Sequence, residues 1–89
     1  MSIDEMSRAE VVQKFGRKSG DTGSPEVQVA LMTQRIEKLV KHFASHVNDQ
    51  HSRRGMFTLI NSRKTLLQYL KSEDIDRYRK TINALNLRK

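Results

Sequence analysis

Apolar residues recur at alternating steps of three and four through the middle of the chain, and this spacing constrains the fold more than any other feature. Val29, Met32, Ile36, Leu39 and Phe43 follow one another at steps of 3, 4, 3 and 4. Side chains spaced in this way lie on one side of an α-helix, because the helix completes a turn every 3.6 residues. The pattern predicts a helix of about twenty residues that buries one side.

The residues around this segment carry helix start and stop signals. Ser24, Pro25 and Glu26 supply an N-cap hydroxyl, a proline at the first helical position and an acid near the positive helix end. Beyond the helix, residues 45–54 are polar and contain no apolar repeat. We therefore expect a polar connection of about ten residues, its end already helical, that lets the next helix return antiparallel.

Three more segments have helical signals. The first opens with Ser2 and Glu5, which match a capping box, and can end at Gly16. The third, of about twenty residues, carries apolar residues from Met56 to Leu70. The break at residues 72–74 is followed by a short fourth helix with apolar residues at Ile75, Tyr78, Ile82 and Leu85. Nothing alternates with period two, so the fold class is all-α with four helices in one domain, residues 1–89.

The charge distribution points to a polyanionic partner. The chain has 17 Lys and Arg against 10 Asp and Glu, a formal net charge of +7, and residues 31–71 alone carry 8 basic and 2 acidic side chains. Such a segment attracts phosphates, although it also fits a solvated helical surface. Cys is absent, which excludes disulfides, thiolate metal sites and cysteine nucleophiles. The longest apolar run, residues 29–32, is too short to span a bilayer, so we expect no membrane contact.

Three polar residues accompany the apolar repeat of the second helix. Gln28, Arg35 and His42 are seven residues apart, which is nearly two helical turns, so they project in a line about 21 Å long. A line of amide, guanidinium and imidazole groups on a rigid helix suits a nucleic-acid surface. The alternative is that these positions only flank and cover the apolar side.

Two further features favour RNA. Glycines in the segment Gly20-Asp21-Thr22-Gly23 let the backbone approach a phosphate or sugar, although an ordinary interhelical turn has the same composition. Asp49 is a lone acid in the most basic stretch, and a carboxylate can accept a hydrogen bond from the guanine 2-amino group in the wide RNA minor groove. It can equally be an ion-pair partner or an N-cap.

Other reactive side chains have simpler explanations. Tyr69 can stack on an unpaired base, yet it also fits the edge of a core. His42 and His46 have metal-ligand spacing, but with no Cys and one nearby carboxylate we expect neither a metal nor another cofactor. The chain lacks the nucleophile-elbow and dinucleotide motifs, so we do not expect an enzyme. The alternative function, from another class, is a helical protein that compacts DNA or acts as an adaptor through charge alone.

The order of these motifs resembles a known family. The string GDTGSPEVQVAL at residues 20–31, Arg35-Ile36, His42, residues 49–55 and residues 66–70 are similar to bacterial small-ribosomal-subunit protein fifteen. This resemblance implies a four-helix fold in which three helices form a bundle and the N-terminal helix is movable. It also implies a cytoplasmic ribosomal protein, monomeric when free, that binds the central domain of small-subunit rRNA early in assembly. Neighbouring small-subunit proteins and large-subunit rRNA would be its further partners.

The resemblance also implies roles for individual residues. Contacts to a three-way RNA junction fall on Asp21, Thr22, Gly23, Gln28, Arg35 and Tyr69. Contacts to a neighbouring minor-groove element with G-U and G-C pairs fall on His42, Asp49 and Ser52, with His46 and Arg53 near the RNA backbone. From charge alone, less specific phosphate affinity is expected from Arg54, Arg63, Lys64 and Lys71.

Overall fold

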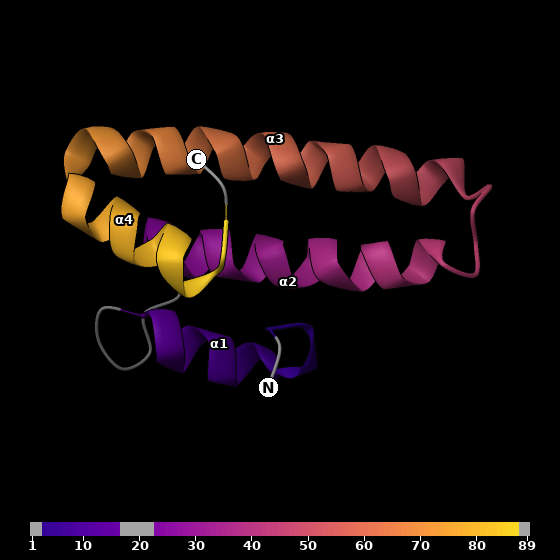
Figure 1. Ribbon diagram of the computed structural model, residues 1–89, viewed down its shortest axis with the longest axis horizontal. Coiled ribbons are helices and arrows are strands. Elements are labelled where there is room, and N and C mark those ends of the chain that lie inside the picture. The colour runs from indigo at the N-terminus through magenta and orange to yellow at the C-terminus, as the bar shows by residue number, and fades with distance from the viewer. Residues whose placement is uncertain (1–2, 17–22, 88–89) are drawn as a thin grey trace.

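The computed structural model describes residues 3–16 and 23–87 of the chain. Within these ranges every regular element is helical, which confirms the all-α prediction (Figure 1). The elements are a short 3-10 turn η1 (Ile3–Glu5) and the helices α1 (Arg8–Phe15), α2 (Pro25–Phe43), α3 (Gln50–Glu73) and α4 (Ile75–Ala84).

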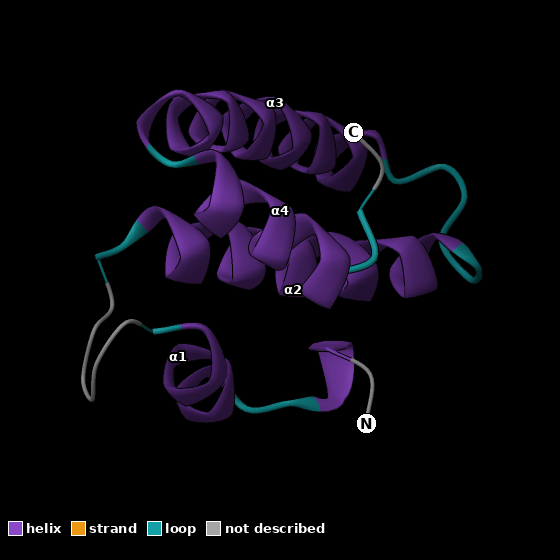
Figure 2. Ribbon diagram, turned by 60° about the vertical axis from the view of Figure 1, so that its left-hand side comes forward, coloured by secondary structure: helices purple, strands orange, loops and turns teal. Residues whose placement is uncertain are grey.

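α2 is the central element of the fold. α3 returns antiparallel beside it, and the connection between the two lies at the far end from α4 (Figure 1). α4 folds back from the end of α3 toward the start of α2, while α1 lies along α2 on the side away from α3 (Figure 2). The three-helix bundle of α2, α3 and α4 with a separate N-terminal helix is as expected. Movement of α1 stays a prediction.

The first helix begins later than the sequence suggested. Its N-cap is Ser7, whose hydroxyl accepts a hydrogen bond from the Glu10 backbone N–H at 3.1 Å, while Glu10 Oε1 accepts one from the Ser7 N–H at 3.0 Å. The expected start of this helix at residues 2–5 was wrong, because a separate 3-10 turn occupies Ile3–Glu5, while Ser2 of the expected capping box lies outside the described residues. The buried side chain of Gln34 donates hydrogen bonds to the backbone carbonyls of Ile3 and Met6, which a continuous helix would use internally. Gly16 ends the helix, as expected.

α3 begins within the segment predicted as a polar connection. Asp49 is the N-cap, so the helix begins at Gln50 and the connection comprises only residues 44–49. The connection predicted at residues 45–54 was expected to be helical at its end, and this helical part covers residues 50–54. The first turn of α3 has no apolar repeat because it extends past the core, with His51 and Arg54 exposed.

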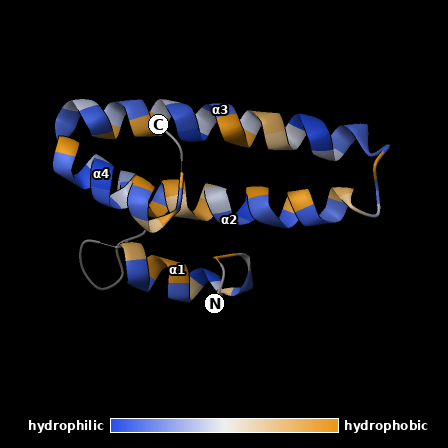
Figure 3. Ribbon diagram, in the orientation of Figure 1, coloured by the Kyte–Doolittle hydropathy of each residue, from blue (hydrophilic) through white to orange (hydrophobic). Residues whose placement is uncertain are grey.

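α2 buries two sides. Toward α3, Val29 and Ile36 of the predicted repeat are buried, while Met32, Leu39 and Phe43 are partly buried. On the other side Val27, Ala30 and Leu31 form a cluster with Val11 of α1. Apolar residues alternate with polar ones along every helix (Figure 3). None of the helices in the described ranges combines the length and apolar character that crossing a membrane requires.

A second apolar cluster holds α4 against α3. It consists of Leu70, Tyr78 and Ile82, with Leu67 and Leu87 packed against it. Asp74 separates the two helices and caps α4, because its Oδ1 accepts hydrogen bonds from the backbone N–H groups of Asp76 and Arg77. The short fourth helix and its restart after residues 72–74 are therefore as predicted. The start of α2 is capped less fully than expected, since the Ser24 hydroxyl makes no capping hydrogen bond.

Candidate nucleic-acid interface

The predicted line of three polar residues lies on a continuous helix. α2 is unbroken from Pro25 to Phe43, so Gln28, Arg35 and His42 share one side of it. Arg35 is exposed, whereas Gln28 and His42 are half-buried beside the α2–α3 contact. The arrangement keeps three different hydrogen-bonding groups at fixed intervals along one side of α2.

The three residues assigned to a minor groove come together where α2 turns into α3. Asp49 Oδ2 accepts hydrogen bonds from His42 Nε2 at 2.9 Å and from the Ser52 hydroxyl at 2.7 Å. Asp49 Oδ1 accepts one from the Ser52 backbone N–H at 3.0 Å, which caps α3. The same carboxylate therefore starts a helix and orients an imidazole and a hydroxyl. We call His42, Asp49 and Ser52 the turn cluster.

The Asp49 carboxylate is held in its ionised form. The side-chain and backbone hydrogen bonds from Ser52, and then the one from His42, lower the pKa of Asp49 far below its ordinary value. Because an ionised carboxylate only accepts hydrogen bonds, the proton in the bond to His42 resides on Nε2. The side chains of His42 and Asp49 keep 34% and 31% of their surface exposed, so both remain accessible to a ligand.

A second histidine extends the turn cluster. The rings of His42 and His46 stack with centroids 4.3 Å apart and planes 2° from parallel. His46 Nδ1 lies 2.9 Å from the Ser45 hydroxyl. In the described part of the chain, no three His, Cys, Asp or Glu side chains are grouped so that they could hold a metal ion.

Arg53 and Arg63, two of the arginines expected at phosphates, also have partners within the protein. The Arg53 guanidinium donates to the Val47 carbonyl from Nε at 3.2 Å and Nη2 at 2.8 Å, and lies 5.0 Å from the centroid of the Phe43 ring. Arg63 Nη1 donates to the hydroxyl of buried Thr33 at 3.2 Å. Burial lowers the pKa of Arg63. Both arginines therefore help to hold α2 and α3 together, which the sequence did not indicate.

The remaining candidates are more accessible. Arg54, Lys64 and Lys71 are exposed on α3, and Lys71 Nζ lies 5.6 Å from the centroid of the Tyr78 ring. Tyr69 is 53% exposed, so it is not enclosed in the core. Gly23 is exposed just before α2, and apart from its two neighbours in the chain no residue lies within 4 Å of where its Cβ would be. Asp21 and Thr22 lie outside the described residues.

The candidate residues divide between the two ends of the helical pair. The turn cluster occupies one end, and Arg35 lies between the ends on α2. At the other end the start of α2, with Gly23 and Gln28, lies near the end of α3, which carries Tyr69 (Figure 1). The geometry gives two separated groups of hydrogen-bonding side chains on one rigid support.

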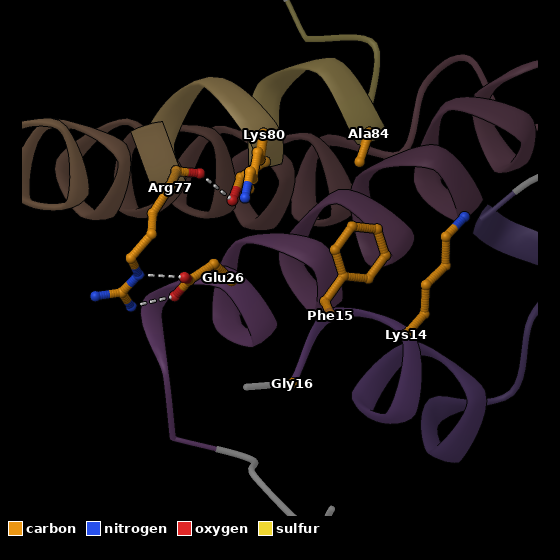
Figure 4. A pocket seen from close by; sticks show the side chains of 8 residues that line it. Lys14, Phe15, Gly16, Glu26, Arg77, Lys80 and Ala84 are labelled. Atoms are coloured by element: carbon orange, nitrogen blue, oxygen red, sulfur yellow. Dashed lines mark hydrogen bonds and ion pairs between the residues drawn. The ribbon is translucent and has the colours of Figure 1, made fainter. Parts of the chain in front are cut away.

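An ion pair at this second end was not foreseen. Arg77 of α4 donates to Glu26 of α2 through Nε and Nη2, at 2.6 and 2.7 Å. The pair borders a pocket of about 520 Å³ between the end of α1, the start of α2 and α4 (Figure 4). The sequence offered no signal for it, because the partners are 51 residues apart and Glu26 had a sufficient explanation as a helix-start acid.

A comparison of the sequence with known protein families identifies the family of the chain. The family model for ribosomal protein S15 matches residues 8–88. The chain belongs to the ribosomal protein S15 family. Proteins of this family are structural components of the small ribosomal subunit that bind rRNA and are not enzymes, and they act in the cytoplasmic ribosome. S15 membership confirms the resemblance noted from the motifs, and all the candidate residues fall within the matched region.

Proposed function

We propose that the protein binds a three-way junction in the central domain of small-subunit rRNA, together with a neighbouring minor-groove element containing G-U and G-C pairs. The observation that carries this proposal is the placement of two polar groups at opposite ends of the antiparallel α2–α3 pair. Such a support suits two RNA features held at a fixed spacing. Family membership makes rRNA the ligand class.

The junction is assigned to the end formed by the start of α2 and the end of α3. The Gln28 amide can donate and accept hydrogen bonds, and Arg35 can bind a phosphate or a base edge with its planar fork. Exposed Tyr69 offers a ring for an unpaired base. Exposed Gly23 allows close approach of the RNA backbone, and Asp21 and Thr22 are proposed to act with it.

The minor-groove element is assigned to the turn cluster. Ionised Asp49 accepts the hydrogen bond that a guanine 2-amino group donates, and this group distinguishes G-containing pairs in a minor groove. His42 and Ser52, both bound to Asp49, lie beside it to contact 2′-hydroxyl or base-edge groups. The hydrogen bonds fix all three side chains before RNA arrives, which reduces the entropy lost on binding.

General affinity comes from basic side chains. Exposed Arg54, Lys64 and Lys71 are proposed to contact phosphates, which would make binding salt-dependent. His46, Arg53 and Arg63 are proposed as further backbone contacts, each through the part of the side chain that faces away from its protein partner.

Binding of this kind would favour one arrangement of the junction arms, because the protein binds that arrangement better than the open one. This would prepare the region for neighbouring small-subunit proteins during assembly. Contact with large-subunit rRNA at the subunit interface and a monomeric free state are parts of the same proposal.

A competition assay tests the proposal. Labelled junction RNA bound to the protein is challenged with unlabelled junction RNA, random RNA duplex and DNA duplex at physiological salt. We expect only the junction RNA to compete efficiently. Equal competition by DNA would contradict the proposal and favour a protein that compacts DNA or acts as an adaptor through charge alone.

A further inference from the structure

The ion pair between Glu26 of α2 and Arg77 of α4 is more enclosed than the contact between His42 and Asp49. Glu26 is 8% exposed, and both of its carboxylate oxygens accept a hydrogen bond from the Arg77 guanidinium (Figure 4). Two parallel charge-assisted hydrogen bonds fix orientation as well as distance. A buried pair of this kind often adds little net stability compared with apolar residues of the same size. The main effect of the pair is therefore to fix the position of the first turn of α2 relative to α4.

The pair links the start of α2, which carries Gln28, to α4, which follows directly after the end of α3, where Tyr69 lies. One apolar cluster comprises buried residues of α1 and α2, and the other comprises buried residues of α3 and α4. Gln28 lies on α2 and Tyr69 on α3, outside both clusters, and Leu85 at the end of α4 packs against the first cluster. Glu26 lies two residues before Gln28 in the first turn of α2, where helices fray most easily because the first N–H groups have no helical partners.

Arg77 is itself fixed relative to α3. Its backbone N–H donates to the side chain of Asp74, the residue that joins α3 to α4. The hydrogen bond that Arg77 donates to Glu26 is the main reason that the pKa of Arg77 is raised, and the nearby carboxylate of Asp74 acts in the same direction. Arg77 thus binds the residue that joins α3 to α4 through its backbone, while its side chain holds the first turn of α2.

We propose that Glu26 and Arg77 form a positioning pair that sets the first turn of α2, and hence Gln28, at the distance from Tyr69 that the RNA junction requires. This inference rests on the proposed function. Neither residue needs to touch RNA. The pair acts by limiting fraying and rotation at the junction end, and the turn cluster at the other end of the helical pair does not depend on it.

The main test is Arg77→Lys, which keeps the positive charge but cannot form the two parallel hydrogen bonds. Affinity is measured separately for an RNA with only the junction and for one with only the minor-groove element. We expect about tenfold weaker binding to the junction RNA, as when the first turn of α2 is in its binding-competent position about one tenth of the time. Binding to the minor-groove RNA should change less than about twofold.

Two further variants make the result decisive. Arg79→Lys, an equal change at an exposed position of α4, should leave both affinities unchanged. Glu26→Gln should also weaken junction binding, although it removes a negative charge and so favours RNA electrostatically. Glu26→Gln retains the shape of the side chain. It therefore provides a second variant for the test if circular dichroism shows that Arg77→Lys is unfolded.

The outcomes separate this inference from the proposed function. If the wild-type protein does not prefer the junction RNA to random duplex, the proposed function is wrong. If the wild type prefers the junction and folded Arg77→Lys and Glu26→Gln bind it equally well, the positioning role is wrong. Equal losses for both RNA fragments would also overturn it, because they would indicate a general effect on the fold.

Discussion

The imidazole of His42, in the last turn of α2, donates a hydrogen bond to the carboxylate of Asp49, the N-cap of α3, over 2.9 Å. This contact joins the two long helices at the end where residues 44–49 connect them. Because Asp49 also holds the Ser52 hydroxyl, a single carboxylate determines the geometry of three candidate RNA-binding side chains.

Replacing Asp49 by Ala should lower affinity for the minor-groove RNA element about tenfold, the expected cost of losing one good base contact. Affinity for random duplex should rise slightly, because the change removes a negative charge from a basic region. Gel-shift titrations with both RNAs measure the difference. A parallel rise in affinity for both would refute base recognition by Asp49.

The lowered pKa of Asp49 predicts how stability depends on pH. A carboxylate with a lower pKa in the folded state stabilises the protein fully above its unfolded value, near 3.8, and this contribution is lost as pH falls through the folded pKa. The free energy of unfolding of the wild type should therefore fall more steeply below about pH 4 than that of Asp49→Asn. Urea unfolding monitored by circular dichroism over this range provides the measurement. Identical slopes would mean that the hydrogen bonds to Asp49 do not persist in solution.

Lys71→Ala should weaken binding to every RNA by a similar factor and reduce the slope of log affinity against log salt by about one. The reason is that an exposed lysine contacting a phosphate contributes counterion release without reading sequence. Lys14→Ala, an equal charge change on α1, should leave the slope unaltered. If the two variants show the same slope as the wild type, Lys71 is not a phosphate contact.

Val11→Ala tests whether α1 packs on α2 in solution. Val11 is completely buried against the cluster formed with α2, so loss of two methyl groups should lower the free energy of unfolding by about 2 kcal/mol. The control Val47→Ala, at a residue 59% exposed, should change it by less than about 0.5 kcal/mol. Equal stabilities of the two variants would contradict the packed position of α1.

Local sequence signals predicted most of the helical architecture. The apolar repeat from Val29 to Phe43 and the signals at Pro25 and Asp74 located α2 and the start of α4, because these depend on residues close together in the chain. The start of α1 was misplaced because its position depends on Gln34, which binds the carbonyls of Ile3 and Met6 from a distant helix. No local pattern contains that information.

The candidate site was predictable to a similar degree. Spacing placed Gln28, Arg35 and His42 on one side of a helix, the position of Asp49 as a lone acid in a basic stretch singled it out, and the family resemblance added Ser52. Arg63 and its partner Thr33 are 30 residues apart in the chain, and Arg77 and its partner Glu26 are 51 residues apart. Such contacts depend on how the helices pack, so charge alone could not show which basic residues are engaged within the protein.

The central claim is that the α2–α3 pair holds two RNA-binding groups at one fixed spacing. The most direct measurement is affinity for a series of RNAs in which base pairs are inserted or deleted between the junction and the minor-groove element. We predict that a single inserted pair reduces affinity to that of an RNA containing only one element, because both ends of a rigid support cannot then be engaged together. Undiminished affinity across the series would contradict the claim.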